Sequence, residues 1–463
     1  MKITTRIGLL AAAAASACLS LPAHAAGEAK NVIFFLGDGM GPATVTASRI
    51  YKYGESGRLT MESLRRTARI KTFSNDAQTT DSAPSMAAYM TGVKMNNEVI
   101  SMSEDTVAYA PNGTQYINGE DTTCTSTNGK PAVTLLELSK AAGRSVGAVS
   151  TTRVGHATPA ATYSHICNRN GYNTIAEQSV PGHANYNAAL GDGVDVLMGG
   201  GQRNYLPLAV NASSKRTDGV NLVTAMEAKG YKYVDTGTKL AALDATSTTK
   251  LLGLFSQSEM AYELDRVNQK LDQPSLSQMT EKALQVLSRN DKGFFLMVEG
   301  GRIDQAHHEG NAYRALNDTV ELSNAVRAAA AKVDLDDTLI IVTADHSHTL
   351  TISGYPARGN NILGLVREIG PDGKLEADYK RDKLGLPFTT LNYVSGRGYT
   401  GATDVAAEGP KYWPGKPTKF QAIKKGRTDL TLIDTTVPNY DQEALFPLAD
   451  ETHGGEEIGR AHV

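Results

Sequence analysis

The chain has 463 residues, of which 41% are hydrophobic and 21% charged, and its formal net charge at pH 7 is -3. This composition is typical of a folded globular protein, large enough for one large α/β domain or two smaller ones. The near-neutral charge gives no electrostatic reason to expect a nucleic acid or an anionic membrane surface as a partner.

Residues 1–25 have the pattern of a secretory signal peptide. Lys2 and Arg6 precede the apolar run "IGLLAAAAASACLSL", and Ala23 and Ala25 follow at the spacing of a cleavage site. The apolar run is too short to span a bilayer comfortably. We therefore expect export to the periplasm or the extracellular medium, and a mature domain over 26–463 without a membrane span.

Short apolar runs alternate with longer helical patterns along the mature chain. We expect strands at 31–36, 145–150, 194–200, 293–300 and 338–345, and helices within 79–92 and beginning near residues 132, 275 and 312. Continuous apolar strands separated by helices predict an α/β fold with a mostly parallel central sheet covered by helices on both faces. From about 355 to 450 no helical period emerges and Gly, Pro, Tyr and Lys are frequent, which predicts an irregular insertion.

The stretch "TTDSAPSMAAYMTG" (79–92) allows two interpretations. Asp81 and Ser82 are ordinary caps of a helix start, and Pro84 is compatible with its first turn. Alternatively, Ser82 is a nucleophile placed where the free N–H groups and the helix dipole favour an anion. The stretch by itself favours the cap.

Polar clusters at the ends of three predicted strands change this balance, because ligands of open α/β sheets bind beyond the carboxyl ends of the strands. Asp304 and His308 are four residues apart and share one face of a helical turn. Each short motif has an ordinary alternative, such as a solvated helix start or a surface histidine. Together they form a set without cysteine that favours catalytic zinc or a harder cation. The members of this set are Asp38, Asp304, His308, Asp345, His346 and His453.

A metal cluster would explain Ser82 as a nucleophile, because coordination lowers the pKa of a hydroxyl that is otherwise unreactive at neutral pH. The segments that carry these residues resemble the alkaline phosphatase family, and are closer to its animal-type branch than to the enteric-bacterial one. They run in order from about residue 30 to 457: "LGDGMG", "TTDSAPSMAAYMTG", "TTRVGHATPAATYSH", "NRNGY", "VEGGRIDQAHHEG", "VTADHSH" and "ETHGGEE".

The resemblance implies an enzyme that hydrolyses phosphate monoesters through a phosphoserine on Ser82, with two zinc ions and one magnesium. One zinc would be held by Asp304, His308 and His453. The other would be held by Asp38, Asp345 and His346 and would activate Ser82.

Further roles follow from the same resemblance. Magnesium would be held by Asp38, Thr158 and Glu299, with His156 beside this site. Arg169 would clamp two phosphate oxygens, and His348 would support the zinc pair. The implied ligands are small phosphate monoesters and inorganic phosphate, and the implied assembly is a homodimer.

The chain also departs from the family pattern. Asp272 matches one ligand of a further, calcium-like site of animal-type enzymes, but Ser256 stands where that pattern has Glu. Gln305 differs from the residue that usually follows the first zinc aspartate. After "ETHGGEEIG" the family continues through another strand and a closing helix, whereas this chain reads "RAHV". We therefore expect an unpaired sheet edge and reduced stability.

Other interpretations stay open at this level. An exported chain permits a disulfide between Cys124 and Cys167, but sequence does not supply the Cα separation that decides it. A sulfatase would need Arg at the position of Met86, and a nucleotide-pyrophosphatase type of phosphodiesterase would usually carry a Thr nucleophile. A metal-binding protein without turnover is the alternative from a different class.

Overall fold

The computed structural model describes residues 29–383, 385–399 and 428–462. The predicted signal peptide lies outside the described residues, as does the 400–427 part of the predicted insertion.

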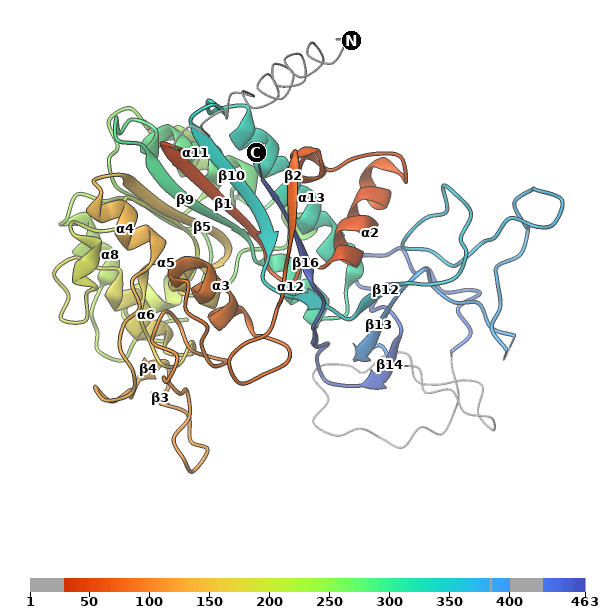
Figure 1. The fold of residues 1–463 in the computed structure, drawn as a ribbon, viewed down its shortest axis with the longest axis horizontal. Coiled ribbons are helices and arrows are strands. Elements are labelled where there is room, and N and C mark those ends of the chain that lie inside the picture. Colours follow the sequence, from red (N-terminus) through yellow and green to blue (C-terminus); the bar gives the residue numbers. More distant parts are fainter. Residues whose placement is uncertain (1–28, 384, 400–427, 463) are drawn as a thin grey trace, which may run out of the picture.

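A nine-stranded sheet forms the centre of the molecule (Figure 1). Seven neighbouring strands, from β10 to β7, are parallel, and two antiparallel strands extend the sheet beyond β10. In spatial order the strands are β2 (Arg66–Ile70), β16 (Ile458–His462), β10 (Thr338–Ala344), β1 (Asn31–Gly37), β9 (Phe294–Gly300), β5 (Ser145–Arg153), β6 (Val196–Gly200), β8 (Leu251–Leu254) and β7 (Lys232–Val234). The predicted parallel sheet and its five predicted strands are confirmed.

Both faces of the sheet are buried, which explains the continuous apolar strands. Along β1, Phe34 and Leu36 enter one core while Ile33 and Phe35 enter the other, as the two-residue period of a strand requires. The first core is covered by α3 (Ser82–Thr91), α4 (Leu135–Ala141) and α5 (Ala157–Tyr163), and the second by α11 (Leu276–Leu287) and α13 (Ala312–Ala330). Helices on both faces are therefore confirmed.

Further helices connect these elements. They are α2 (Pro42–Tyr53), α6 (Tyr172–Gln178), α7 (Gln202–Tyr205), α8 (Leu222–Glu227), α9 (Gly237–Ala242), α10 (Glu263–Asn268) and α12 (Arg302–His308), with 3-10 turns η1 (Thr60–Ser63) and η2 (Ala188–Leu190).

The structure corrects the expectation of an unpaired edge at β10. Residues 458–462 form β16, which pairs antiparallel with β10 on one side and with β2 on the other (Figure 1). A strand therefore does follow "ETHGG". The pairing joins β10 at Ile341 and Val342, so this edge is paired in part, and the expected low stability stays a prediction.

Three small sheets accompany the central sheet in the described residues. β11 (Ser347–His348) pairs with β15 (His453–Gly454), and β3 (Ile117–Asn118) with β4 (Asp121–Thr122). β12 (Leu350–Ile352), β13 (Leu391–Gly396) and β14 (Ala444–Pro447) form a three-stranded sheet. Within its described part, the insertion is therefore irregular with little strand and no helix, as predicted.

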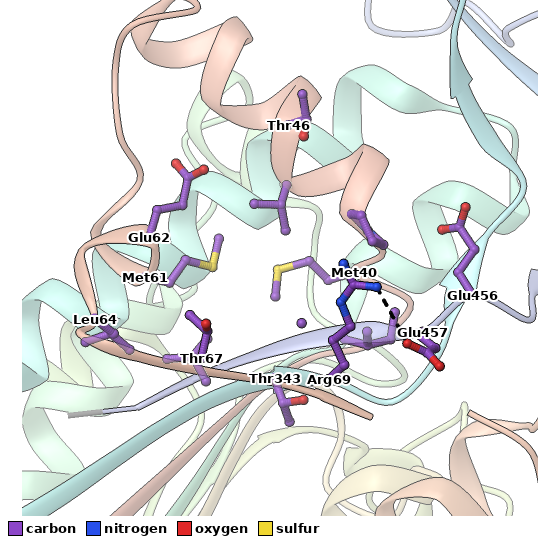
Figure 2. A pocket seen from close by; sticks show the side chains of 15 residues that line it. Met40, Thr46, Met61, Glu62, Leu64, Thr67, Arg69, Thr343, Glu456 and Glu457 are labelled. Atoms are coloured by element: carbon purple, nitrogen blue, oxygen red, sulfur yellow. Dashed lines mark ion pairs between the residues drawn. The ribbon is translucent and has the colours of Figure 1, made fainter. Parts of the chain in front are cut away.

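A largely apolar pocket of about 830 Å³ lies between α2, η1, β2 and the start of β16. Figure 2 shows Met40 and Met61 facing its interior, and the Arg69–Glu457 ion pair at its edge. None of the predicted metal ligands lines this pocket, so it is not the predicted metal site.

Within the described ranges, no helix combines the length and the apolar composition that crossing a bilayer requires.

Candidate active site

The strand register brings three acidic residues to one edge of the sheet. Gly37 of β1 pairs with Ala344 of β10 and Gly300 of β9, so Asp38, Glu299 and Asp345 lie side by side at the carboxyl ends. This is the edge at which open α/β sheets bind ligands.

Helix α12 begins directly after β9 and carries two residues of the first predicted zinc set, Asp304 and His308. His308 Nε2 lies 3.2 Å from Asp304 Oδ1, as the four-residue spacing predicts. His453 joins them from β15, with its Nε2 3.1 Å from His308 Nε2. His348 lies in the same cluster, because its Nε2 is 2.8 Å from Asp304 Oδ1. One ligand atom from each of these four residues lies within 4.8 Å of the others.

The second predicted zinc set adjoins the first. Asp38, Asp345 and His346 are at most 1% exposed and their ligand atoms also lie within 4.8 Å of one another. His346 Nε2 is 3.2 Å from Asp38 Oδ1 and 3.5 Å from Asp345 Oδ2. The rings of His346 and His453 stack with their centroids 3.5 Å apart, so the two sets form one continuous cluster.

Backbone carbonyls orient all three imidazoles of the predicted zinc sets. His308 Nδ1 donates to the carbonyl of Glu451 (2.6 Å), His453 Nδ1 to that of Thr80 (2.9 Å), and His346 Nδ1 to that of Ser347 (3.1 Å). A carbonyl only accepts, so each of these Nδ1 atoms carries a proton, and each ring turns its Nε2 toward the cluster. Metal-binding histidines are held in this way.

The predicted magnesium set contains buried polar atoms that lack hydrogen-bond partners. They are Asp38 Oδ2, Glu299 Oε1, Thr158 Oγ1 and His156 Nδ1. Asp38, His156 and Glu299 also form a third group of ligand atoms within 4.8 Å. Unsatisfied buried oxygens are costly, so a hard cation or an ordered water fits this group.

Electrostatics at this edge also favour a cation. Burial raises the pKa of Glu299 to about 7. Burial, together with repulsion from Asp345, Asp304 and Glu299, raises the pKa of Asp38 well above its usual value. A bound cation would reverse both shifts, because it stabilises the charged carboxylates.

Asp81 is the helix cap that the sequence predicts at this helix start, and Ser82 has the position expected of the candidate nucleophile. Asp81 is the N-cap of α3, and its carboxylate accepts from Ala83 N at 2.6 Å. Ser82 is the first residue of the helix, and its Oγ lies 3.1 Å from Asp38 Oδ1 and 3.2 Å from His346 Nε2. The hydroxyl therefore faces the second zinc set, while the cap belongs to its neighbour.

Arg169 lies beside the magnesium set. Its Nη1 donates to Asp81 Oδ1 at 3.1 Å, and its Nη2 lies 3.1 Å from His156 Nε2. The sequence analysis missed Asp81 as the partner of this guanidinium and Glu451 as the partner of His308. Their positions directly before Ser82 and two residues before His453 were the available signals.

The remaining predicted residues lie outside the cluster. Cys124 and Cys167 form a disulfide, with a Cα separation of 6.1 Å. Gln305 accepts a hydrogen bond from the Arg302 guanidinium.

The calcium-like pair also makes local contacts. The Asp272 carboxylate accepts from Thr238 N (2.8 Å) and Oγ1 (3.0 Å), and Ser256 Oγ donates to the Ser258 carbonyl (2.7 Å). Among the described residues, Asp272 belongs to no group of three metal-binding side chains, so no calcium-like site is supported.

Comparisons with known proteins agree with this geometry. Residues 29–460 match the model of the family described as alkaline phosphatase. The tissue-nonspecific alkaline phosphatase of Mus musculus is 38% identical over 464 residues, covering 93% of this chain and 78% of the mouse protein. The alkaline phosphatase of Gadus morhua is 36% identical over 470 residues, covering 95% and 88%.

Solved structures that are similar to this chain are also alkaline phosphatases. The structure of Thermus thermophilus alkaline phosphatase is similar with a TM-score of 0.63 and 25% identity, covering 94% of this chain and 86% of that one. A cold-active alkaline phosphatase from Shewanella sp. has a TM-score of 0.55 and 29% identity over 71% of each chain. The chain thus belongs to the alkaline phosphatase family and is a phosphatase.

Proposed function

We propose that the chain hydrolyses phosphate monoesters to an alcohol and inorganic phosphate through a phosphoserine on Ser82. The observation that carries the proposal is the position of Ser82 Oγ, 3.1 Å from Asp38 Oδ1 and 3.2 Å from His346 Nε2 at the start of α3. A hydroxyl at a helix N-terminus and against a candidate metal site has the environment that an attacking oxyanion needs.

We propose two zinc ions and one magnesium for the three groups of ligands. Asp304, His308 and His453 would hold one zinc, and Asp38, Asp345 and His346 the other, because mixed imidazole and carboxylate sets suit zinc. Asp38, Thr158 and Glu299 would hold magnesium through oxygen atoms, with His156 beside it. Bound at these residues, the ions would supply Lewis-acid charge that lowers the pKa of the Ser82 hydroxyl and offsets charge on the phosphate.

The side chains of the protein then account for both halves of the reaction. In the first half, Ser82 Oγ forms a bond to phosphorus, the bond from phosphorus to the ester oxygen breaks, and the alcohol leaves with the proton that the Ser82 hydroxyl gives up. In the second half, water attacks phosphorus and the Ser82–phosphate bond breaks, which releases inorganic phosphate and restores the hydroxyl. Arg169, held by Asp81, would bind two phosphate oxygens in both halves with its planar pair of N–H donors.

The wider organisation is part of the same proposal. Residues 1–25 would direct export to the periplasm or the extracellular medium and be removed after Ala25. Residues 26–463 would form one catalytic domain with the insertion at about 355–450. We expect this domain to assemble as a homodimer.

The test is hydrolysis of p-nitrophenyl phosphate at alkaline pH by the purified mature chain, before and after chelation, with zinc and magnesium restored. We expect activity that depends on the metals and is abolished in Ser82→Ala, while that variant keeps its zinc content. Thr91→Ala is the matched control, because Thr91 lies at the other end of α3 and its hydroxyl donates to the Ala87 carbonyl. Zinc binding without turnover in the wild type would contradict the proposal and favour a metal-binding protein.

A further inference from the structure

Glu451 is a buried carboxylate beside the cluster that none of the roles above uses. It is 1% exposed and lies two residues before His453. Its Oε1 accepts from Thr349 N at 2.6 Å and from the Thr349 hydroxyl, and its Oε2 is hydrogen-bonded to His348 Nδ1. The carboxyl group is therefore fixed by Thr349 and faces the imidazole of His348.

His348 connects Glu451 to the first zinc set, because it also contacts Asp304. The other ring nitrogen of His348, Nε2, lies 2.8 Å from Asp304 Oδ1. An aspartate carboxylate accepts, so His348 Nε2 carries the donated proton. Among the imidazoles near Asp304 Oδ1, His348 makes the shortest contact, and Glu451 holds the His348 ring at the opposite nitrogen.

The backbone of Glu451 contacts the same set a second time. Its N–H donates to the His308 carbonyl at 2.9 Å, and its carbonyl accepts from His308 Nδ1 at 2.6 Å. One residue thus joins the end of α12, the strand β11 that carries His348, and the segment that leads to His453.

We infer that Glu451 is a positioning residue for the first zinc set: its side chain holds His348 so that His348 orients Asp304, while its backbone orients His308. This inference rests on the proposed function, since it concerns zinc at Asp304, His308 and His453. Mutation of a residue that hydrogen-bonds to a metal ligand typically weakens metal binding by about 10- to 100-fold.

The experiment measures the zinc dissociation constants of the full mature chain by competition with a chromogenic chelator, alongside the melting temperature of the apo form. We expect Glu451→Ala and Glu451→Met to raise the dissociation constant of one zinc by about 10- to 100-fold. The Met variant fills the volume of Glu without an acceptor, so it keeps the test available if the Ala variant does not fold. The Gln variant keeps an acceptor for Thr349 and a polar partner for His348 Nδ1, and should stay close to the wild type.

The matched control is Glu457→Ala in the same segment, whose carboxylate pairs at the surface with Arg69 and contacts no histidine of the cluster. A double-mutant cycle with His348→Ala separates positioning from general stability. If Glu451 acts through His348, Glu451→Met weakens zinc binding in the wild type and adds little in the His348→Ala background.

The inference is overturned if Glu451→Met binds zinc like the wild type, if it and His348→Ala have additive effects, or if Gln loses as much affinity as Met. A failure of the proposed function gives a different result. In that case the wild type binds no zinc, or Asp304→Asn leaves zinc binding unchanged.

Discussion

Arg169 Nη1 donates to Asp81 Oδ1 at 3.1 Å, and this same oxygen accepts from Ala83 N at 2.6 Å at the start of α3. The proposed phosphate clamp and the proposed nucleophile, Ser82, are thus held by a single carboxylate. Asp81 therefore combines a contribution to helix stability with a contribution to phosphate binding, and the two contributions are separable by substitution.

Asp81→Ala should lose both contributions. The missing cap lowers stability by about 0.5–2 kcal/mol. The freed guanidinium of Arg169 should weaken inhibition by inorganic phosphate by about 10-fold, because a hydrogen bond between charged groups contributes about 1.5–3 kcal/mol. Thermal unfolding and the inhibition constant of phosphate measure the two effects.

Asp81→Ser is the matched variant, because Ser caps helices well but carries no charge for Arg169. We expect a melting temperature near that of the wild type together with the weakened phosphate inhibition of the Ala variant. Wild-type inhibition constants in both variants would show that Asp81 does not hold the clamp.

Arg169→Lys should raise KM for p-nitrophenyl phosphate by about 10-fold or more while zinc content is unchanged. Lys is a point charge that cannot contact Asp81 and two phosphate oxygens at once through a planar fork. Arg203→Lys is the control, since Arg203 pairs with Glu120 at 3.5 Å away from the cluster. Equal KM values in the two variants would argue against Arg169 as the clamp.

The central sheet could be predicted because its strands are buried on both faces. In "NVIFFL", consecutive side chains enter two different cores, so the run is continuously apolar. The strands β2 and β16 have no such pattern: "IGRAH" pairs with β10, and "RTARI" in turn pairs with β16. Tertiary context rather than local propensity decides such strands, and the expectation of an unpaired edge failed for that reason.

In the site, too, local spacing predicts some features, whereas others depend on contacts between distant parts of the chain. Asp304 and His308 could be placed together because one helical turn connects them. Contacts such as Arg169 with Asp81 or Glu451 with His308 join positions 88 and 143 residues apart in the chain. Spacing in the sequence carries no information on such pairs. The motifs therefore indicated the candidate ligands, while the groups that orient them appeared only in the fold.

Replacing both Cys124 and Cys167 by Ser should lower stability by about 2–4 kcal/mol. The disulfide closes a loop with a sequence separation of 43 and restricts the unfolded chain. Cys167 lies two residues before Arg169, so KM for p-nitrophenyl phosphate should also rise. Melting temperatures with and without reductant test this prediction: reductant should lower that of the wild type and leave that of the double variant unchanged. Identical melting temperatures of the wild type and the variant would contradict it.

Asp318 on α13 should make stability depend on pH. Burial raises the pKa of Asp318 to about 8 against the opposing charge of Arg302. Between about pH 4 and 8 the folded state therefore keeps a proton that the unfolded state has lost. The unfolding free energy should fall as pH rises through this window, by at most about 1.4 kcal/mol per pH unit from this group.

Asp318→Asn removes this titration and keeps an acceptor for Glu263 N, which lies 3.1 Å from Asp318 Oδ2. Melting temperatures of the wild type and the variant, measured from pH 5 to 9, should diverge as pH rises, with the variant the more stable at pH 8 and above. The exposed Asp291→Asn is the control and should follow the wild type at every pH. Parallel curves for Asp318→Asn and the wild type would show that Asp318 ionises at the same pH in the folded and unfolded states, because only a difference in bound protons gives the two curves different slopes.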